Sequence, residues 1–281
     1  MEFYMIYKDK FVLLASKHRK EQVIEPVFRE KMGCTLCVED IDTDQFGTFT
    51  GEIPRPLSAY ETCILKAKHA AKDKKYFLSI ASEGSFGPHP SNPFIPHAHE
   101  IMVFVDLEHD WVIAEQLVTP NTNYKMMTIH QDTILDSFLE TVHFPSHALT
   151  LQSGDMQHVL KKGINSHDKL QSALAVGFKK YNELFIATDM RAMMNPTRMQ
   201  TLAELAEKLA TRITTSCPEC GIPGFGFKSV SGHLPCSLCG DDTQMYRYEE
   251  WGCIRCDYQE QRPRKDQLLM AAPTYCDYCN P

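Results

Sequence analysis

Apolar and polar positions along the first two hundred residues predict strands and helices that follow one another. Short apolar runs bounded by polar residues predict buried strands, which lie at 11–15, 36–41 and 76–82. Apolar residues spaced by three and four positions predict helices at 20–32 and 58–72. Gly33 suits the C-terminal stop of the first helix, and Ser58 and Glu61 have the spacing of a capping box at the start of the second. Strands that alternate with helices favour parallel pairing through right-handed crossovers.

The segments after the third strand carry weaker patterns. Gly, Pro and polar residues are frequent at 83–96, which predicts an irregular connection. Two apolar runs then predict an antiparallel hairpin of 101–107 with 111–118. The elements expected beyond it are three helices, a strand and a last helix, at 131–142, 155–162, 166–181, 184–188 and 196–213. We therefore expect one α/β domain over 1–214, with a mixed, mainly parallel sheet and flanking helices.

Composition and charge narrow the class of protein and its partners. Apolar residues make up 43% and charged residues 23% of the 281 positions, which is typical of a globular chain. The formal net charge of −7 argues against a protein that holds nucleic acid mainly by neutralising phosphates. No apolar run is long enough to span a bilayer, and residues 1–10 lack the pattern of a signal peptide. The sequence predicts a cytoplasmic protein with no membrane partner.

The cysteines mark a second domain over 215–281. Eight of the eleven cysteines fall there, as four C-x-x-C pairs. Each pair places two thiolates on one tight turn, and two pairs complete a tetrahedral zinc site. Disulfides are the alternative, which a reducing compartment disfavours. The sequence therefore predicts a small zinc-ribbon-like β module with two structural zinc ions, held by Cys217, Cys220, Cys236, Cys239, Cys253, Cys256, Cys276 and Cys279.

The pairing of the four C-x-x-C turns follows less directly from the sequence. The aromatic run at 244–251, between the second and third pairs, is typical of the hairpin of a zinc ribbon. This favours one site built from the second and third pairs and another built from the first and fourth. A sequential arrangement, first with second and third with fourth, is the alternative.

The expected role of the cysteine module is structural. A closed site of four thiolates has no open coordination position, and metal compensates for the small core of about 65 residues. From Cys217 onward, six Lys and Arg residues oppose nine acids. A scaffold or a contact surface for a protein partner is therefore favoured over a DNA reader. Cys34 and Cys37 also have C-x-x-C spacing, but we interpret them as core cysteines rather than as a third metal site.

Two polar clusters follow predicted strands, at the edge where open α/β sheets bind ligands. One of them opens the first helix and has the cations that suit an anion; it comprises Ser16, Lys17, His18 and Lys20. A solvated basic turn is an equally supported alternative. The other cluster contains Glu83 and Ser85 beside glycines. A carboxylate in that position suits Mg²⁺ together with the oxygens of a phosphorylated substrate.

A third polar cluster follows the last strand and opens the last helix. It contains Asp189, Arg191, Asn195 and Arg198. Two arginines near a helix N-terminus suit a phosphate or a carboxylate. The alternative is a capping network, in which Asn195 is the N-cap and Asp189 pairs with Arg191. Ligand binding is favoured because Arg198 lies on the turn whose amides are free. We expect the three clusters to converge on a single pocket for an anionic ligand.

Several segments together resemble the house-cleaning nucleoside triphosphate pyrophosphatases, in particular the inosine/xanthosine triphosphatase superfamily. The segments that carry the resemblance are 15–20, 53–62, 66–70, 80–85 and 195–198. The first, Ala-Ser-Lys-His-Arg-Lys, lies where that family has its phosphate-binding turn. Ile-Ala-Ser-Glu-Gly-Ser resembles the metal-binding strand end, and Asn-Pro-Thr-Arg falls where the family has a base-contacting turn. The whole chain also resembles a bacterial family of unknown function that carries the same cysteine tail.

The resemblance implies Mg²⁺-dependent hydrolysis of non-standard nucleoside triphosphates to the monophosphate and pyrophosphate. It implies that Glu83, with Glu61 or Asp44, holds Mg²⁺ and that Arg198 holds the base or a phosphate. The residues to which it assigns neutralisation of the phosphates are Lys17, Lys20 and Lys66. The competing hypothesis is a non-catalytic adaptor, whose α/β domain binds a nucleotide or another small anion while the zinc module docks a protein or nucleic-acid partner.

Overall fold

A computed structural model describes residues 6–47, 53, 56–89 and 92–281. The chain divides into two compact units. One unit is Asp9–Ala210, and the other is Thr211–Pro281 together with the described start of the chain at 6–8. Within these described ranges, none of the helices combines the length and the apolar character needed to cross a membrane.

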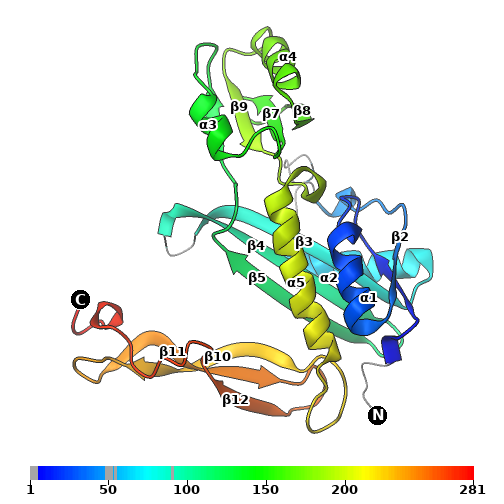
Figure 1. The fold of residues 1–281 in the computed structure, drawn as a ribbon, viewed down its shortest axis with the longest axis vertical. Helices are drawn as coiled ribbons and strands as arrows, with labels where there is room; N and C mark the ends of the chain where they lie inside the picture. The colour runs from blue at the N-terminus through cyan, green and yellow to red at the C-terminus, as the bar shows by residue number, and fades with distance from the viewer. Residues whose placement is uncertain (1–5, 48–52, 54–55, 90–91) are drawn as a thin grey trace. The chain divides into compact units, whose positions relative to one another are not determined.

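The first unit is built on a five-stranded sheet with the order β2-β1-β3-β4-β5 (Figure 1). The strands are β1 (Phe11–Leu14), β2 (Thr35–Val38), β3 (Leu78–His89), β4 (Asn92–Asp106) and β5 (Trp111–Thr119). β1 pairs in parallel with β2 and β3, whereas the β3–β4 and β4–β5 pairs are antiparallel. The sheet is mixed, as the sequence predicts, but the expectation that it is mainly parallel is wrong.

Residues 83–96 account for this difference. They were expected to form an irregular connection, but most of them lie in the long arms of β3 and β4. In this hairpin Gly84 pairs with Glu100 and Gly87 pairs with His97. Glycine weakens a strand taken by itself, and the ladder with the partner strand compensates for this. The local composition therefore predicts a loop where the tertiary structure forms a hairpin.

Three long helices accompany this sheet: α1 (Glu21–Met32), α2 (Ala59–Lys74) and α5 (Pro196–Thr214). Gly33 ends α1 in the left-handed conformation, and Ser58 and Glu61 form both bonds of the predicted capping box at α2. α2 packs on one face of the sheet through Cys63, Ala67 and Ala70. α1 and α5 lie side by side on the opposite face, where Lys31 Nζ is 2.8 Å from a carboxylate oxygen of Glu207 (Figure 1).

A second, antiparallel sheet lies between β5 and α5 in the chain. Its order is β6-β9-β7-β8, from β6 (Met126–Ile129), β7 (Leu149–Ser153), β8 (Val159–Ile164) and β9 (Leu184–Thr188). Helices α3 (Asp136–Thr141) and α4 (His167–Phe178) pack on its apolar core. The helix expected at 155–162 is wrong, because this segment pairs with β7 and Gly163 adopts a positive φ of 68°. The strands β6 and β7 had no predicted counterpart.

The second unit is a three-stranded antiparallel sheet with the order β10-β11-β12. Its strands are β10 (Gly226–Pro235), β11 (Asp242–Gly252) and β12 (Gln259–Pro263). Short 3₁₀ turns lie at η2 (Asp44–Phe46), η3 (Ala192–Met194) and η4 (Pro273–Tyr275). C-x-x-C turns precede β10, follow β11 and join these two strands, so the strand lengths determine which cysteines can meet.

Candidate functional site

A cavity of about 380 Å³ lies beside the β1–α1 loop, β3, α2 and α5 of the first unit. Eight residues predicted for the site line it: Ser16, Lys17, His18, Lys20, Lys66, Glu83, Ser85 and Arg198. The other lining residues are Ala15, Thr43, Gly47, Ser82, Gly84, Phe86 and Tyr124. The three segments expected to converge therefore each contribute to one cavity.

Lys20 is the most buried cation of this cavity, with 5% of its surface exposed. Its ammonium donates to the carbonyl oxygen of Ser82 at 3.1 Å and to the hydroxyl of Ser82 at 2.8 Å. Both acceptors are neutral, and an ammonium has a third hydrogen to donate. Burial and the nearby Arg198 guanidinium lower the pKa of Lys20 to about 8. Lys20 is thus a buried cation that still has a hydrogen bond to offer in the cavity.

Two other lysines of the cavity have carboxylate partners. Lys66 Nζ is 2.6 Å from Oε1 of Glu83, and Lys17 Nζ is 2.7 Å from Oδ1 of Asp42. Arg198 is also paired with a carboxylate. Among the cations that line the cavity in the described part of the chain, Lys20 alone lacks such a partner.

Arg198 is held by an ion pair that is buried inside the first unit. Its Nε donates to Oε1 of Glu100 at 2.6 Å, its Nη2 donates to Oε2 at 3.1 Å, and its Nη1 donates to the carbonyl of Met190. Glu100 is fully buried and Arg198 is 6% exposed. A Cβ at Gly84 would lie 2.6 Å from both Arg198 Nη2 and Glu100 Oε1. Glycine is therefore required at position 84 for the pair to pack against β3.

Three residues predicted for ligand binding do not line the cavity: Asp189, Arg191 and Asn195. Arg191 Nε donates to Oδ1 of Asp189 at 2.9 Å, and the other carboxylate oxygen accepts from the Gly163 amide at 3.0 Å. Asn195 Oδ1 accepts from the Arg198 amide at 3.0 Å and so caps α5. The structure places these three residues in the capping network that the sequence offered as an alternative.

An aromatic wall completes the cavity and was not foreseen from the sequence. The rings of Phe86 and Tyr124 have centroids 6.2 Å apart and planes 32° apart. The guanidinium of Arg198 lies 5.1 Å from the centre of the Phe86 ring. Phe86 belongs to the stretch predicted as irregular, and Tyr124 lies between β5 and β6, where no element was expected. Neither residue has a local signal that could have pointed to the site.

His18 is a neutral imidazole in this cavity at physiological pH. Burial first, and then the charges of Lys20 and Arg198, lower its pKa from 6.5 to about 3. The unfolded chain binds a proton at His18 near pH 6.5, whereas the folded chain does so only near pH 3. The unfolded state therefore gains protons first on acidification, and the free energy of unfolding falls as the pH drops through this interval.

Between pH 7 and pH 4.5, the free energy of unfolding should fall in the wild type by about 2 kcal/mol more than in the His18→Gln variant, which lacks the imidazole. Urea unfolding at the two pH values measures the difference. His130→Gln removes an exposed imidazole outside the cavity and serves as the control. Identical pH dependence in the wild type and His18→Gln would show that burial of this imidazole has no such effect.

The carboxylates that the resemblance implies for Mg²⁺ have other partners where the structure describes their side chains. Glu83 is paired with Lys66, Glu61 serves the cap of α2, and the side chain of Asp44 lies outside the described residues. Within the described part of the chain, groups of three or more metal-ligating side chains consist only of cysteines. Cys34 is buried in the core and belongs to no such group of described residues.

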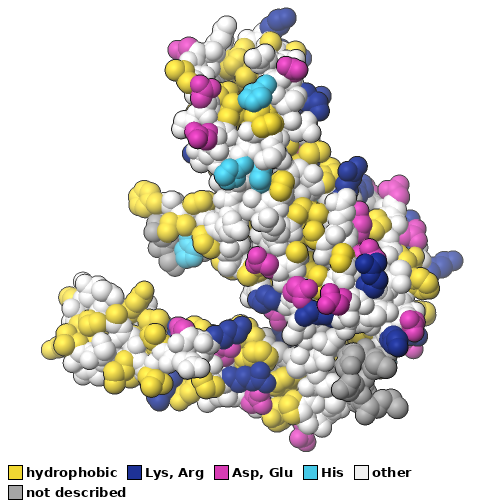
Figure 2. Space-filling model, in the orientation of Figure 1, with side chains coloured by type: hydrophobic (Ala, Val, Ile, Leu, Met, Phe, Trp, Pro, Cys, Tyr) yellow, Lys and Arg dark blue, Asp and Glu magenta, His cyan; other side chains and the backbone are white. Residues whose placement is uncertain are grey.

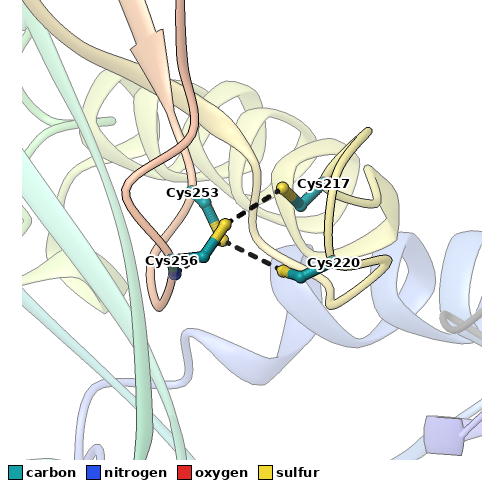
Figure 3. Close-up of side chains that lie close together, drawn as sticks. All are labelled: Cys217, Cys220, Cys253 and Cys256. Atoms are coloured by element: carbon teal, nitrogen blue, oxygen red, sulfur yellow. Dashed lines mark hydrogen bonds between the residues drawn. The ribbon is translucent and has the colours of Figure 1, made fainter.

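The eight C-terminal cysteines form two groups of four, whose sulfurs lie within 4.8 Å of one another. Sulfurs of different turns lie 3.6 and 3.7 Å apart in one group (Figure 3) and 3.6 and 3.9 Å apart in the other. Sulfurs at the corners of a tetrahedron around zinc, with bonds of about 2.3 Å, stand about 3.8 Å apart. A disulfide has a bond of about 2.05 Å, and all eight thiols are free. The residues therefore fit two structural zinc ions.

The pairing of the C-x-x-C turns is interleaved, first with third and second with fourth, so both sequence interpretations are wrong. The groups are Cys217, Cys220, Cys253 and Cys256, and Cys236, Cys239, Cys276 and Cys279. β10 and β11 are antiparallel, and Gly226 pairs with Gly252. The start of β10 and the end of β11 therefore lie together, and each carries one turn of the first group.

The length of β11 excludes the pairing that the aromatic run suggested. β11 has 11 residues, which at a rise of about 3.4 Å per residue separate the second and third turns by roughly 35 Å. The aromatic run is thus a strand between two metal sites rather than a hairpin above one. β12 then runs back along β11, and the chain returns to the second turn, where the fourth turn completes the site.

The fold and these sites define a class of protein in which an α/β unit with a cation-lined cavity precedes a β module with two interleaved four-cysteine metal sites. The chain belongs to DUF6671, a domain of unknown function whose family model matches residues 66–281. This confirms the expected likeness to a family of unknown function over these residues, whereas the likeness was expected over the whole chain. The match includes Lys66, Glu83, Arg198 and the C-terminal cysteines, and the β1–α1 loop precedes it. The comparison with curated proteins found no match.

Proposed function

We propose that the cavity of the first unit binds a small phosphorylated ligand of the nucleotide class. Lys20 carries this proposal, because its buried ammonium lines the cavity and, among the described residues, donates to neutral acceptors alone. The lowering of its pKa to about 8 corresponds to roughly 3 kcal/mol of unfavourable interaction for the charged form. A phosphate in the cavity offsets this cost, since charge-assisted hydrogen bonds to phosphate oxygens are strong.

The remaining lining residues favour a ligand with an aromatic ring as well as a phosphate. Lys66 and Lys17 add cations next to Lys20, and Phe86 and Tyr124 offer ring surfaces on which a nucleobase can stack. The volume of about 380 Å³ lies within the usual range for small-molecule sites. A cationic part and an aromatic part in one cavity fit the two ends of a nucleotide.

Hydrolysis of a nucleoside triphosphate to the monophosphate and pyrophosphate is the second candidate function, in line with the likeness to the house-cleaning pyrophosphatases. The observation that favours it is Glu83, a carboxylate that lines the cavity next to Lys66. A bound phosphate could replace Glu83 as the partner of Lys66, and Glu83 would then be able to hold Mg²⁺. The ion would stabilise the negative charge on the phosphate oxygens. We rank binding without turnover first, because Glu83 is the one carboxylate among the described residues that line the cavity.

For the second unit we propose that both metal ions are structural zinc and that the module contacts a protein partner. Four thiolates close each site, so no coordination position remains for a substrate. Cysteines stay reduced and able to bind metal in a reducing compartment. For this reason we propose that the protein is located in the cytoplasm. The nine acids against six Lys and Arg residues in this module argue against nucleic acid as the partner.

The Lys20→Met variant should fold but no longer respond to ligand. We expect pyrophosphate and nucleoside triphosphates at about 100 times the dissociation constant to raise the apparent stability of the wild type by about 2.7 kcal/mol. Lys20→Met keeps the apolar stem but lacks the ammonium, so the stabilisation should disappear. Thermal unfolding with and without each compound measures this. The control is Lys31→Met, which loses a surface ion pair of α1 and should retain the full shift.

Pyrophosphate release from the same triphosphates in the presence of Mg²⁺ separates the two candidates. Release by the wild type that Glu83→Gln abolishes would assign hydrolysis, whereas a thermal shift without release would assign binding. A thermal shift of equal size in the wild type and Lys20→Met would refute the proposed site.

A further inference from the structure

The surface around the Cys236 group carries several large apolar side chains. Leu238 is 73%, Leu269 82% and Tyr278 77% exposed, and Met270 and Tyr275 are more than half exposed. Figure 2 shows hydrophobic side chains gathered over this end of the module. Contiguous exposed apolar surface is uncommon on soluble domains and marks sites of interaction.

These side chains flank one metal group although they are far apart in the chain. Leu238 lies inside the second C-x-x-C turn and Tyr278 inside the fourth, and the sulfurs of these two turns meet. The Ala271 amide donates to the Pro235 carbonyl at 2.9 Å, and the Ser237 amide donates to the Ala271 carbonyl at 2.9 Å. Leu269 and Met270 are thereby held next to the second turn. We call this set of five residues the apolar cap.

The metal geometry does not require apolar residues at these positions. The first metal group is also built from two C-x-x-C turns. The third position is Glu219 in one of these turns and Arg255 in the other. The second group carries Leu238 and Tyr278 at the equivalent positions. Two metal sites of the same chemistry therefore differ in their outer surface, and the apolar one is a feature of the sequence rather than of the zinc turn.

Acidic side chains outnumber basic ones around the apolar cap. Residues 236–245 and 266–281 contain four aspartates and no Lys, Arg or His. Just before the second range, Arg264 is paired with Asp266 and Lys265 is exposed. Asp241, Asp242 and Asp277 are exposed as well, so the net charge around the apolar cap is negative. This net negative charge disfavours nucleic acid and anionic membranes, and it favours a positively charged partner.

We propose that the apolar cap and its acidic rim bind a basic, amphipathic peptide segment of a partner protein. Apolar side chains of the segment would cover the cap, and its Lys or Arg residues would face the three exposed aspartates. Burial of the apolar surface supplies affinity, while the charges select basic segments over acidic ones. The proposal is independent of the ligand assigned to the cavity of the first unit.

Two labelled peptides with the same amphipathic helical pattern test the proposal, one built from Leu and Lys and the other from Leu and Glu. We expect the Leu/Lys peptide to bind the zinc-loaded full chain by fluorescence anisotropy and the Leu/Glu peptide not to bind. Leu238→Ser combined with Tyr278→Ser should weaken binding by about tenfold or more, as loss of central apolar anchors does. The matched control is Glu219→Ser with Arg255→Ser, at the equivalent positions of the first group, which should leave the affinity unchanged.

Zinc content is measured for each variant, so that a loss of binding is scored only where both ions remain. Asp241→Asn with Asp242→Asn leaves the apolar cap intact and should weaken binding of the Leu/Lys peptide several-fold at low salt. Equal affinity of the Leu238/Tyr278 variant and the wild type would overturn the proposal. So would equal binding of both peptides, preferential binding of a labelled single-stranded oligonucleotide, or self-association of the wild type that the same variant abolishes, because a second copy would then be the occupant.

Discussion

Replacing Cys217 and Cys253 together by serine should remove one zinc ion per chain and leave the other in place. Both cysteines belong to the same metal group, so the double change destroys one site only. A structural zinc site contributes about 10–16 kcal/mol of apparent binding free energy at neutral pH. Its loss should therefore unfold the end of the β10–β11 hairpin that this group holds. Metal analysis of the purified variant and proteolysis of the module measure both effects.

A second pair of substitutions makes this result specific for the interleaved arrangement. Cys217→Ser with Cys236→Ser takes one ligand from each group, so both ions should be lost. If the second and third turns shared an ion, each of the two double variants would lose both ions. If neighbouring turns were paired, the outcomes would be reversed, with two ions lost from the first variant and one from the second. The two zinc counts together thus identify the pairing.

Glu100→Leu should lower the free energy of unfolding of the first unit by about 3–5 kcal/mol. The substitution leaves the guanidinium of Arg198 buried without its carboxylate, and an uncompensated buried charge is strongly destabilising. Both side chains are almost completely buried and bond through two donors. Urea unfolding measures the loss. Glu115→Leu, which removes a carboxylate whose lysine partner Lys208 is exposed, should cost less than about 1 kcal/mol.

The double variant Glu100→Leu with Arg198→Met tests whether the charge causes the loss. Replacing both members of a buried ion pair by apolar groups is often nearly neutral, so most of the stability should return. A double-mutant cycle gives the coupling between the two residues. Additive losses, with no recovery in the double variant, would show that packing rather than the unpaired charge is responsible.

Features that depend on a few neighbouring residues were predictable from the sequence. Gly33 ends α1, and Ser58 and Glu61 cap α2, because each motif is completed by backbone atoms within a few positions. The C-x-x-C spacing alone predicted the eight thiols as metal ligands, because a single turn positions both sulfurs of a pair, and the structure gathers them in two groups that fit a metal ion. Lys20 and Arg198 line the cavity from helix starts, as their positions predicted. Glu83 lines it too, although it lies within β3 rather than after the end of a strand.

Features that depend on distant partners could not be obtained in this way. Residues 83–96 look like a loop because their glycines weaken a strand, yet the antiparallel partner holds them in β3 and β4, and Gly84 is needed where the Arg198–Glu100 pair packs. The segment at 155–162 has helical spacing, but pairing with β7 and the positive φ of Gly163 make it β8. Phe86 and Tyr124 reach the cavity from segments that carried no pattern at all.

The sequence by itself determined the helices with local caps, the strands with strong apolar runs and the four C-x-x-C turns that make up two four-cysteine groups. Only the tertiary structure decided how the C-x-x-C turns pair, which arms form the β3–β4 hairpin, and that no carboxylate of the described residues pairs with Lys20. The physical reason is the distance along the chain between the interacting residues. Helix caps and C-x-x-C turns are formed by residues only a few positions apart. Strand ladders, buried ion pairs and metal groups join residues tens of positions apart, and their geometry exists only once the chain has folded.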